Sequence, residues 1–166
     1  MRGRKSSDLP GPRSIVVHLR LGDVIEKKHR NGDCLWQKGS GAPGFYVKGV
    51  EYFSELTRRI LNLTAREQNN TRVFLVGSYD HGAGRHEASV RYRSHVTSFS
   101  QSKGFHVITR WEHTPDEDFV FMTHSPIFVY GGGGYSRLVG ECVRRFNGAT
   151  PMDWHGAWQR PFLCHR

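Results

Sequence analysis

The stretch Ser14-Ile15-Val16-Val17-His18-Leu19-Arg20-Leu21-Gly22-Asp23 decides the fold class of this chain. It opens with a β-branched apolar run between Pro12 and Gly22, which is typical of a buried strand. Because side chains alternate along a strand, His18 and Arg20 share one side where the run ends, and Gly22 releases the chain into the next segment. A buried strand that ends in polar side chains predicts an open parallel sheet with a ligand site at its carboxyl edge.

The rest of the chain alternates between strand and helix patterns. We expect further strands at 71–77, 104–109 and 126–130, and helices at about 50–63, at 87–100, from Pro115, and after the glycines 131–134. The intervening segment 21–45, rich in charge and glycine, is expected to be a long loop. One side of the last helix should carry its apolar residues Leu138, Val139, Cys142, Val143 and Phe146. The pattern predicts an α/β, Rossmann-like, three-layer domain with a mostly parallel sheet.

Length and charge limit the possible functions. The 166 residues suffice for one well-buried domain, so we expect a basic flexible tail at 1–13 and a single domain at 14–166. Lys and Arg outnumber Asp and Glu by 24 to 15, and the net charge of +9 favours an anionic partner such as a nucleic acid, a membrane surface, a polyanionic glycan or a diphosphate. No apolar run approaches the roughly 20 residues that a membrane span needs, so no span is expected in this chain.

The cysteines and histidines show no metal-binding pattern. Cys34, Cys142 and Cys164 lack paired C-x-x-C spacing, which argues against a zinc cluster and leaves one disulfide plus a free thiol open. We therefore expect neither a metal nor another cofactor. Sequons at Asn62 and Asn69 would suit a secretory lumen but arise often by chance. The compartment stays open: the Golgi or endoplasmic reticulum lumen in a eukaryote, the cytoplasm in a bacterium or a virus.

Candidate binding residues follow the expected strands. The guanidinium of Arg20 is suited to bind a pyrophosphate through two hydrogen bonds. From composition alone, a surface Arg paired with an Asp is about equally consistent with the sequence. The glycines at 131–134 let a phosphate approach the start of a helix, where Ser136 either donates to it or caps the helix. Asp80, after the second strand, could accept hydrogen bonds from a guanine edge or a ribose hydroxyl, or form a turn.

In combination, these motifs resemble those of one enzyme superfamily. The H-x-R-x-G-D pattern of His18 to Asp23 is similar to a motif of the α1,2-, α1,6- and protein O-fucosyltransferases. The segment Asp116 to Ser125, followed by a strand and a Gly-Tyr-Ser turn, resembles their second signature, a D-F-x-x-M-s helix before a strand and an F-S turn. Asp80 lies where these enzymes often carry an acidic residue. The similarity spans Ser14 to Phe146 and rests on the order and spacing of the motifs.

The resemblance implies a fold, a donor and roles for single residues. The fold would be the carboxyl-terminal half of a glycosyltransferase-B enzyme, which binds GDP-fucose without a metal and transfers the sugar, with inversion, to a glycan or protein hydroxyl. Arg20 would clamp the diphosphate and stabilise the charge that develops on it. Asp23, or else Glu26, is the candidate general base, unless a neighbouring lysine pairs with it. The implied donor-binding residues are His18, Arg20, Gly22, Asp80, Asp118, Gly133, Gly134, Tyr135 and Ser136.

The chain also departs from the superfamily pattern. Leu21 stands where several members have a second Arg, so the clamp is either weaker or completed elsewhere. Glycine replaces the Asn, Ser or Thr that usually begins the F-S turn, and Tyr135 replaces its Phe. A complete enzyme has another domain before the first motif, whereas only residues 1–13 precede Ser14 here. We therefore expect the acceptor side of the cleft to come from a missing amino-terminal domain or a partner chain.

Two other functions remain open. Asp116-Glu117-Asp118 satisfies D-x-D, which holds Mg²⁺ or Mn²⁺ in metal-dependent glycosyltransferases, but its place after Pro115 at a helix start disfavours that role. A non-catalytic or truncated basic module that binds nucleotides, nucleic acid or a sulfated glycan would explain the charge and the mixture of Arg with Tyr92 and Trp111. No nucleic-acid motif is present, which disfavours a nucleic-acid partner. The resemblance instead implies a nucleotide-sugar donor and a glycan or glycoprotein acceptor as partners.

Overall fold

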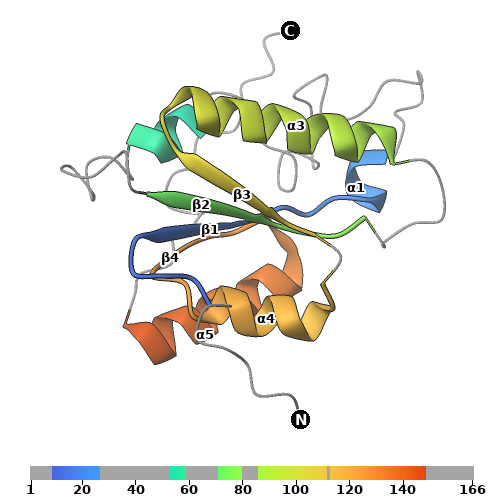
Figure 1. The fold of residues 1–166 in the computed structure, drawn as a ribbon. Helices are drawn as coiled ribbons and strands as arrows, with labels where there is room; N and C mark the ends of the chain where they lie inside the picture. Colours follow the sequence, from blue (N-terminus) through green and yellow to red (C-terminus); the bar gives the residue numbers. More distant parts are fainter. Residues whose placement is uncertain (1–8, 27–52, 59–70, 80–85, 112, 149–166) are drawn as a thin grey trace, which may run out of the picture.

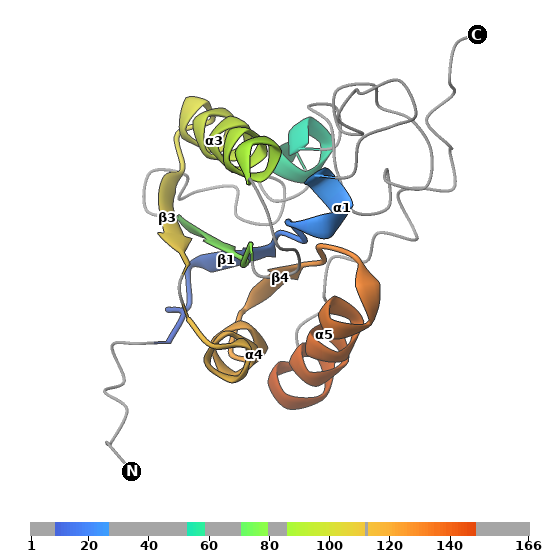
Figure 2. The ribbon, with the colours of Figure 1, turned by 90° about the vertical axis from the view of Figure 1, so that its right-hand side faces the viewer.

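The protein is an α/β domain whose sheet lies between two layers of helices (Figures 1 and 2). The computed structural model describes residues 9–26, 53–58, 71–79, 86–111 and 113–148. Within these ranges the strands form one parallel sheet in the order β3-β2-β1-β4. The strands are β1 (Ser14–His18), β2 (Arg72–Val76), β3 (His106–Arg110) and β4 (Ile127–Val129). The predicted fold class is thus confirmed.

Helices cover both faces of the sheet. The short α1 and the long α3 lie on one face together with the helical residues 53–58, and α4 and α5 lie on the other (Figure 2). Neighbouring parallel strands need a crossover connection, usually a helix, so strands and helices alternate along the chain as the sequence pattern predicts. The bounds are α1 (Asp23–Glu26), α3 (Glu87–Ser102), α4 (Pro115–Thr123) and α5 (Gly133–Asn147).

The central strand β1 contributes to the apolar core on both faces of the sheet. All of its residues are buried, and its side chains alternate between the two helical layers. Ile15 and Val17 pack with Tyr92 and Val96 of α3 on one face. Val16, on the other face, belongs to the cluster beneath α4 and α5. Burying each of these side chains stabilises the fold by about 1.5–3 kcal/mol, which holds the end of β1 in a fixed place.

Several sequence predictions need correction. The expected loop from Leu21 begins with the helix α1, and β3 extends to Arg110 rather than ending at 109. In α5 the buried side consists of Ser136, Val139, Gly140 and Val143. Leu138 and Phe146, expected on that side, are 55% and 77% exposed. The reason is that Gly140 lets the Tyr130 ring pack against the helix, since a Cβ there would overlap this ring, and this contact sets which side of α5 faces the sheet.

Residues 9–13, the described part of the expected tail, lie outside β1 and form a turn that leads into it. The backbone N–H of Arg72 donates to the carbonyl of Arg13 over 3.1 Å, and the N–H of Ser14 donates to that of Gly11. Other sequence predictions lie outside the described residues: the tail at 1–8, the loop beyond 26, the sequons, and Cys34, Asp80 and Cys164. Among the helices that are described, none has the length and apolar character of a membrane span.

Candidate functional site

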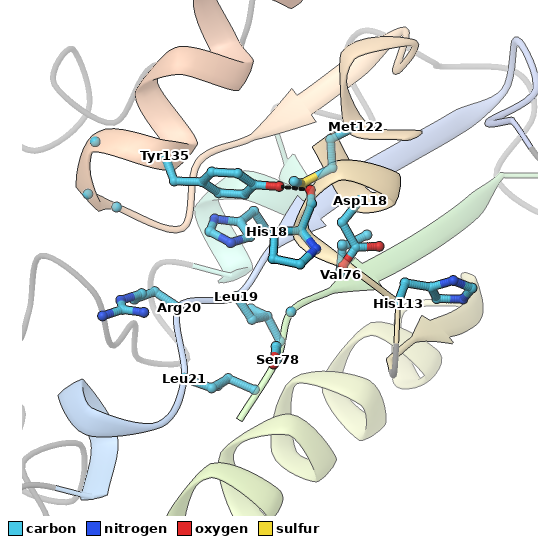
Figure 3. A pocket seen from close by; sticks show the side chains of 15 residues that line it. His18, Leu19, Arg20, Leu21, Val76, Ser78, His113, Asp118, Met122 and Tyr135 are labelled. Carbon is cyan, nitrogen blue, oxygen red and sulfur yellow. Dashed lines mark hydrogen bonds between the residues drawn. The ribbon is translucent and has the colours of Figure 1, made fainter. Parts of the chain in front are cut away.

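A cavity of about 420 Å³ opens at the carboxyl edge of the sheet, a size within the usual range for small-molecule sites. It lies where β1 and β2 end and where α4 and α5 begin, and Figure 3 shows it from close by. Residues from distant parts of the sequence meet there because parallel strands end at one edge. The predicted site residues that line it are His18, Arg20, Asp118, Gly133, Gly134 and Tyr135.

Arg20 lines the cavity between Leu19 and Leu21, which also line it but are anchored in the core. The chain leaves β1 in an extended course, with the N–H of Leu19 donating to the carbonyl of Val76 over 2.8 Å. Leu19 and Leu21 are 4% and 0% exposed and belong to the core, so the residue between them faces the opposite way. Arg20 and Tyr135 lie on one side of the cavity in Figure 3, and Asp118 lies on the other.

The turn between β4 and α5 presents a helix start to the same cavity. Gly132 has φ 90° and ψ 164°, a conformation that only glycine adopts without strain. Helix α5 then begins at Gly133, and its first N–H groups and positive dipole end favour an anion. A Cβ on Gly134 would meet nothing within 4 Å. The helix start is therefore open to a phosphate group.

Ser136 has a structural role in this turn. Its side chain is fully buried, and its hydroxyl oxygen accepts a hydrogen bond of 2.9 Å from the N–H of Gly131. The residue does not line the cavity. Of the two roles considered for Ser136 from the sequence, the geometry favours stabilisation of the helix start over contact with a phosphate.

Asp118 is held on the cavity wall by a buried ion pair. Its Oδ1 accepts a hydrogen bond of 2.8 Å from Nε of Arg110, with the two side chains 8% and 17% exposed. The guanidinium of Arg110 lies 4.4 Å from the ring centre of Phe121. Burial raises the pKa of the Asp118 carboxyl, and the hydrogen bond and charge of Arg110 oppose this shift. A carboxylate retains further lone pairs, so Asp118 can accept hydrogen bonds from a ligand.

Tyr135 joins the starts of α4 and α5 beside the cavity. Its hydroxyl donates a 2.6 Å hydrogen bond to the carbonyl of Pro115, drawn as a dashed line in Figure 3. Its ring centre lies 5.6 Å from that of His18. Burial raises the pKa of the phenol to about 12, and the charges of Asp118 and Asp116 act in the same direction. The hydroxyl is therefore a protonated donor at neutral pH.

We expect Tyr135 to ionise later than an ordinary tyrosine. Because its pKa is higher in the folded state than the ordinary 10.0, it stabilises the fold below pH 10, and this stabilisation is lost as the pH rises toward 12. The difference in phenolate absorbance between the native chain and the Tyr135→Phe variant, titrated with base, should show a step near pH 12. A step at the ordinary value would contradict the partial burial of this hydroxyl beside Asp118 and Asp116.

Gly22 and Glu26 do not line the cavity. Gly22, at φ 68°, donates its N–H to Oγ of Ser89 over 3.1 Å. The carboxylate of Glu26 accepts from the N–H groups of Ala88 and Ser89 over 3.3 and 2.7 Å, so it caps the start of α3. Asp23 lies in α1, but its side chain is outside the described part of the structure, as is all of Asp80.

Glu117 and Asp118, at the start of α4, both have partners within the fold. Thr114 and Glu117 form a capping box: each side chain accepts a hydrogen bond from the other's backbone N–H. No group of three or more His, Cys, Asp or Glu side chains that could hold a metal ion is found in the described ranges.

Sequence reasoning missed part of the cavity wall. His113, Ser78 and Met122 also line it, and none of them is among the site residues expected from the sequence. His113 follows the third strand as Arg20 follows the first, so its position after a strand could have identified it. Its Nδ1 lies 3.9 Å from the Glu117 carboxylate, so it stands next to the capping box, on the same wall as Asp118.

Comparison with solved structures places this fold among known ones. The structure of POFUT1 in complex with GDP matches with a TM-score of 0.50 and 11% identity, over 87% of this chain and 43% of that chain. POFUT1 in complex with GDP-fucose matches with the same score and identity, over 87% and 41%. The fold is fucosyltransferase-like. This chain spans less than half the length of either structure. No family model and no curated protein matches its sequence.

Proposed function

We propose that this domain binds a GDP-sugar, GDP-fucose, in the cavity and supports transfer of the sugar to a glycan or protein hydroxyl. The observation that carries the proposal is that Arg20 and the glycine-lined start of α5 line one cavity. A guanidinium and the N–H groups of a helix start are both anion-binding groups, and a diphosphate can contact the two at once. The likeness to a fucosyltransferase solved with GDP and GDP-fucose supports the same ligand.

The remaining wall suits the nucleoside. Asp118, across the cavity from Arg20 in Figure 3, offers carboxylate oxygens to the N–H groups of guanine or to ribose hydroxyls. The Arg110 ion pair and the helix α4 fix the direction of these oxygens. His18, whose ring approaches Tyr135, shapes the pocket between the diphosphate and this acidic wall. We propose no metal for donor binding, since Arg20 and the helix dipole supply positive charge where the diphosphate would lie.

The reaction would be an inverting displacement at the anomeric carbon. The acceptor oxygen forms a bond to this carbon from one side while the bond to the diphosphate oxygen breaks, and the electron pair leaves with GDP. The acceptor proton goes to a general base, for which Asp23 remains the candidate. Arg20 and the start of α5 would stabilise the charge that grows on the leaving diphosphate, which lowers the barrier. The acceptor side of the cleft would come from a second domain or a partner chain.

A thermal-shift comparison of GDP, UDP, ADP and GDP-fucose tests this function. At a concentration 100 times its Kd, a ligand stabilises the fold by about 2.7 kcal/mol, which raises Tm by roughly 5–10 °C for a domain of this size. We expect this shift for GDP and GDP-fucose, a smaller one for UDP and ADP, and little change on adding a chelator. An equal response to all nucleotides, or none, would contradict the proposal.

The same measurement separates the two alternatives. If chelation removed the GDP response, the metal-dependent D-x-D mechanism would be favoured. If binding ignored the nucleotide and fell steeply with salt, the non-catalytic basic module would be favoured, because release of counterions makes such binding salt-dependent.

A further inference from the structure

A second group of polar and aromatic side chains lies beside the cavity, on the α3 side of the sheet. The rings of His86, Tyr79 and Trp111 are stacked, with centres 5.4 Å apart for the first pair and 5.6 Å for the second, at interplanar angles of 19° and 12°. The guanidinium carbon of Arg93 lies 5.5 Å from the centre of Tyr79 and 5.1 Å from that of Trp111. We call these four residues the aromatic cluster.

The topology of the sheet brings the aromatic cluster to the functional edge. Tyr79 follows β2, Trp111 follows β3, and His86 and Arg93 belong to the start of α3 between them. A Cβ on Gly77 would overlap the Trp111 ring, so the indole packs directly on the end of β2. Gly77 also lines the cavity. The aromatic cluster and the cavity are therefore neighbours that share a strand end.

The polar atoms of the aromatic cluster have unusually few partners. The Tyr79 hydroxyl, Nδ1 of His86 and Nε1 of Trp111 are buried side-chain atoms with no hydrogen-bond partner in the described structure. Nor does a carboxylate pair with Arg93 among the residues described. Native proteins contain few such atoms, and each calls for an explanation. Three of them in one stack, next to an unpaired cation, indicate a site that a ligand completes.

The chemistry of these groups selects an anion. An indole N–H and a guanidinium can only donate hydrogen bonds, and a phenol and the Nδ1–H tautomer of an imidazole can donate as well. Burial raises the pKa of the Tyr79 phenol, although the charge of Arg93 opposes the shift, so the hydroxyl keeps its proton at neutral pH. A ligand that pairs with these groups must accept hydrogen bonds and carry negative charge. A carboxylate, sulfate or phosphate group meets both requirements.

We propose that Tyr79, His86, Arg93 and Trp111 form an oxyanion-binding subsite, distinct from the cavity that Arg20 lines, which receives a negatively charged group of the acceptor. The assignment to the acceptor rests on the proposed function, whereas oxyanion binding itself does not. The subsite would favour acidic glycans over neutral ones. The shared chemistry is an oxyanion, and its source, a sulfate ester or a uronic acid, is decided by the experiment.

The indole N–H resonance of Trp111, assigned with a Trp111→Phe variant, reports on binding directly. We titrate the full chain with sodium sulfate, and with sodium chloride at equal ionic strength. A second pair of titrations compares glucuronate and glucose 6-sulfate with uncharged glucose. We expect a saturable shift with sulfate and with the charged sugars, and none with chloride or glucose. The charged sugar that binds more tightly identifies the source of the oxyanion.

Two variants test the assignment to these residues. Arg93→Gln should lower sulfate affinity roughly tenfold or more, the usual effect of losing a charged hydrogen-bond donor. Its matched control is Arg91→Gln, an exposed position on the same helix with the same loss of charge, which should leave affinity unchanged. Tyr79→Phe keeps the ring and removes the unpartnered hydroxyl. It should weaken sulfate binding several-fold and raise Tm, because no buried polar group is left unsatisfied.

Three results would overturn the subsite: no saturable shift, an equal loss in Arg91→Gln, or competitive displacement of sulfate by GDP. The proposed function is judged separately by the thermal shift with GDP. Arg93→Gln should keep that shift, and Arg20→Ala should lose most of it while keeping the Trp111 response to sulfate. Loss of the GDP response alone in the native chain would therefore refute donor binding and leave the oxyanion subsite standing.

Discussion

Replacing Arg20 by alanine is expected to lower the affinity for GDP by about 30-fold, the largest loss we predict for any side chain of the cavity. Charge-assisted hydrogen bonds to phosphate are each worth about 1.5–3 kcal/mol. Because Arg20 is partly exposed, solvent screens part of this energy, so we expect a total of about 2 kcal/mol. Isothermal titration calorimetry with GDP measures the effect. Arg20→Lys, which keeps the charge without the planar fork, should give an intermediate loss.

The matched control is Arg137→Ala. Arg137 is exposed in the second turn of α5 and does not line the cavity, so its removal changes the net charge equally without touching the proposed diphosphate site. Its affinity for GDP should stay within about twofold of the native value. Equal losses in both variants would show that GDP binds through the overall positive charge. The proposal that Arg20 binds the diphosphate would then be wrong.

Gly131→Ala is the second change with a large expected effect, here on stability. A Cβ at this position would overlap the backbone carbonyl of His18 and approach its Nδ1 to 2.7 Å. Since β1 is buried on both faces, the strand end cannot move away easily. Overpacking of this kind costs about 2–3 kcal/mol, or roughly 5–10 °C in Tm for a domain of this size. Thermal unfolding followed by circular dichroism measures the loss.

Gly134→Ala, three residues further on, should lower GDP affinity without lowering stability. Its Cβ would meet nothing within 4 Å, and alanine favours a helix more than glycine by up to about 1 kcal/mol. Tm should therefore stay the same or rise slightly. Because Gly134 lines the proposed phosphate site, a methyl group added there should lower GDP affinity. A Gly134→Ala variant that binds GDP like the native chain would show that the diphosphate does not approach this helix start.

The strands were predictable because each is a short, β-branched apolar run between breakers. The alternation with helices predicts parallel strands, and β1 does pair in parallel with both β2 and β4. The exposed side chains of Leu138 and Phe146 were not predictable from periodicity. A single contact, Tyr130 against Gly140, decides the orientation of α5, and it joins two residues whose proximity depends on the finished fold.

The site residues that come directly after a strand could be predicted from the sequence. Arg20 and the glycines before α5 were identified by that rule, and the structure places both on one cavity; their part in donor binding stays a prediction. The Arg110–Asp118 ion pair and the aromatic cluster were not predicted, because their members are spread over several elements. Only the β2-α3-β3 connection brings Tyr79 next to Trp111, and no spacing in the sequence indicates this.

The central position of β1 has a consequence for biosynthesis. Strand β1 leaves the ribosome before both of its neighbours, and one of them, β4, begins only at Ile127, more than a hundred residues later. At about 5–20 residues per second, translation leaves one edge of β1 unpaired for roughly 5–20 s. During that interval an apolar segment without its second partner is prone to aggregate. Nascent chains should therefore depend on chaperones until the second half of the sheet is made.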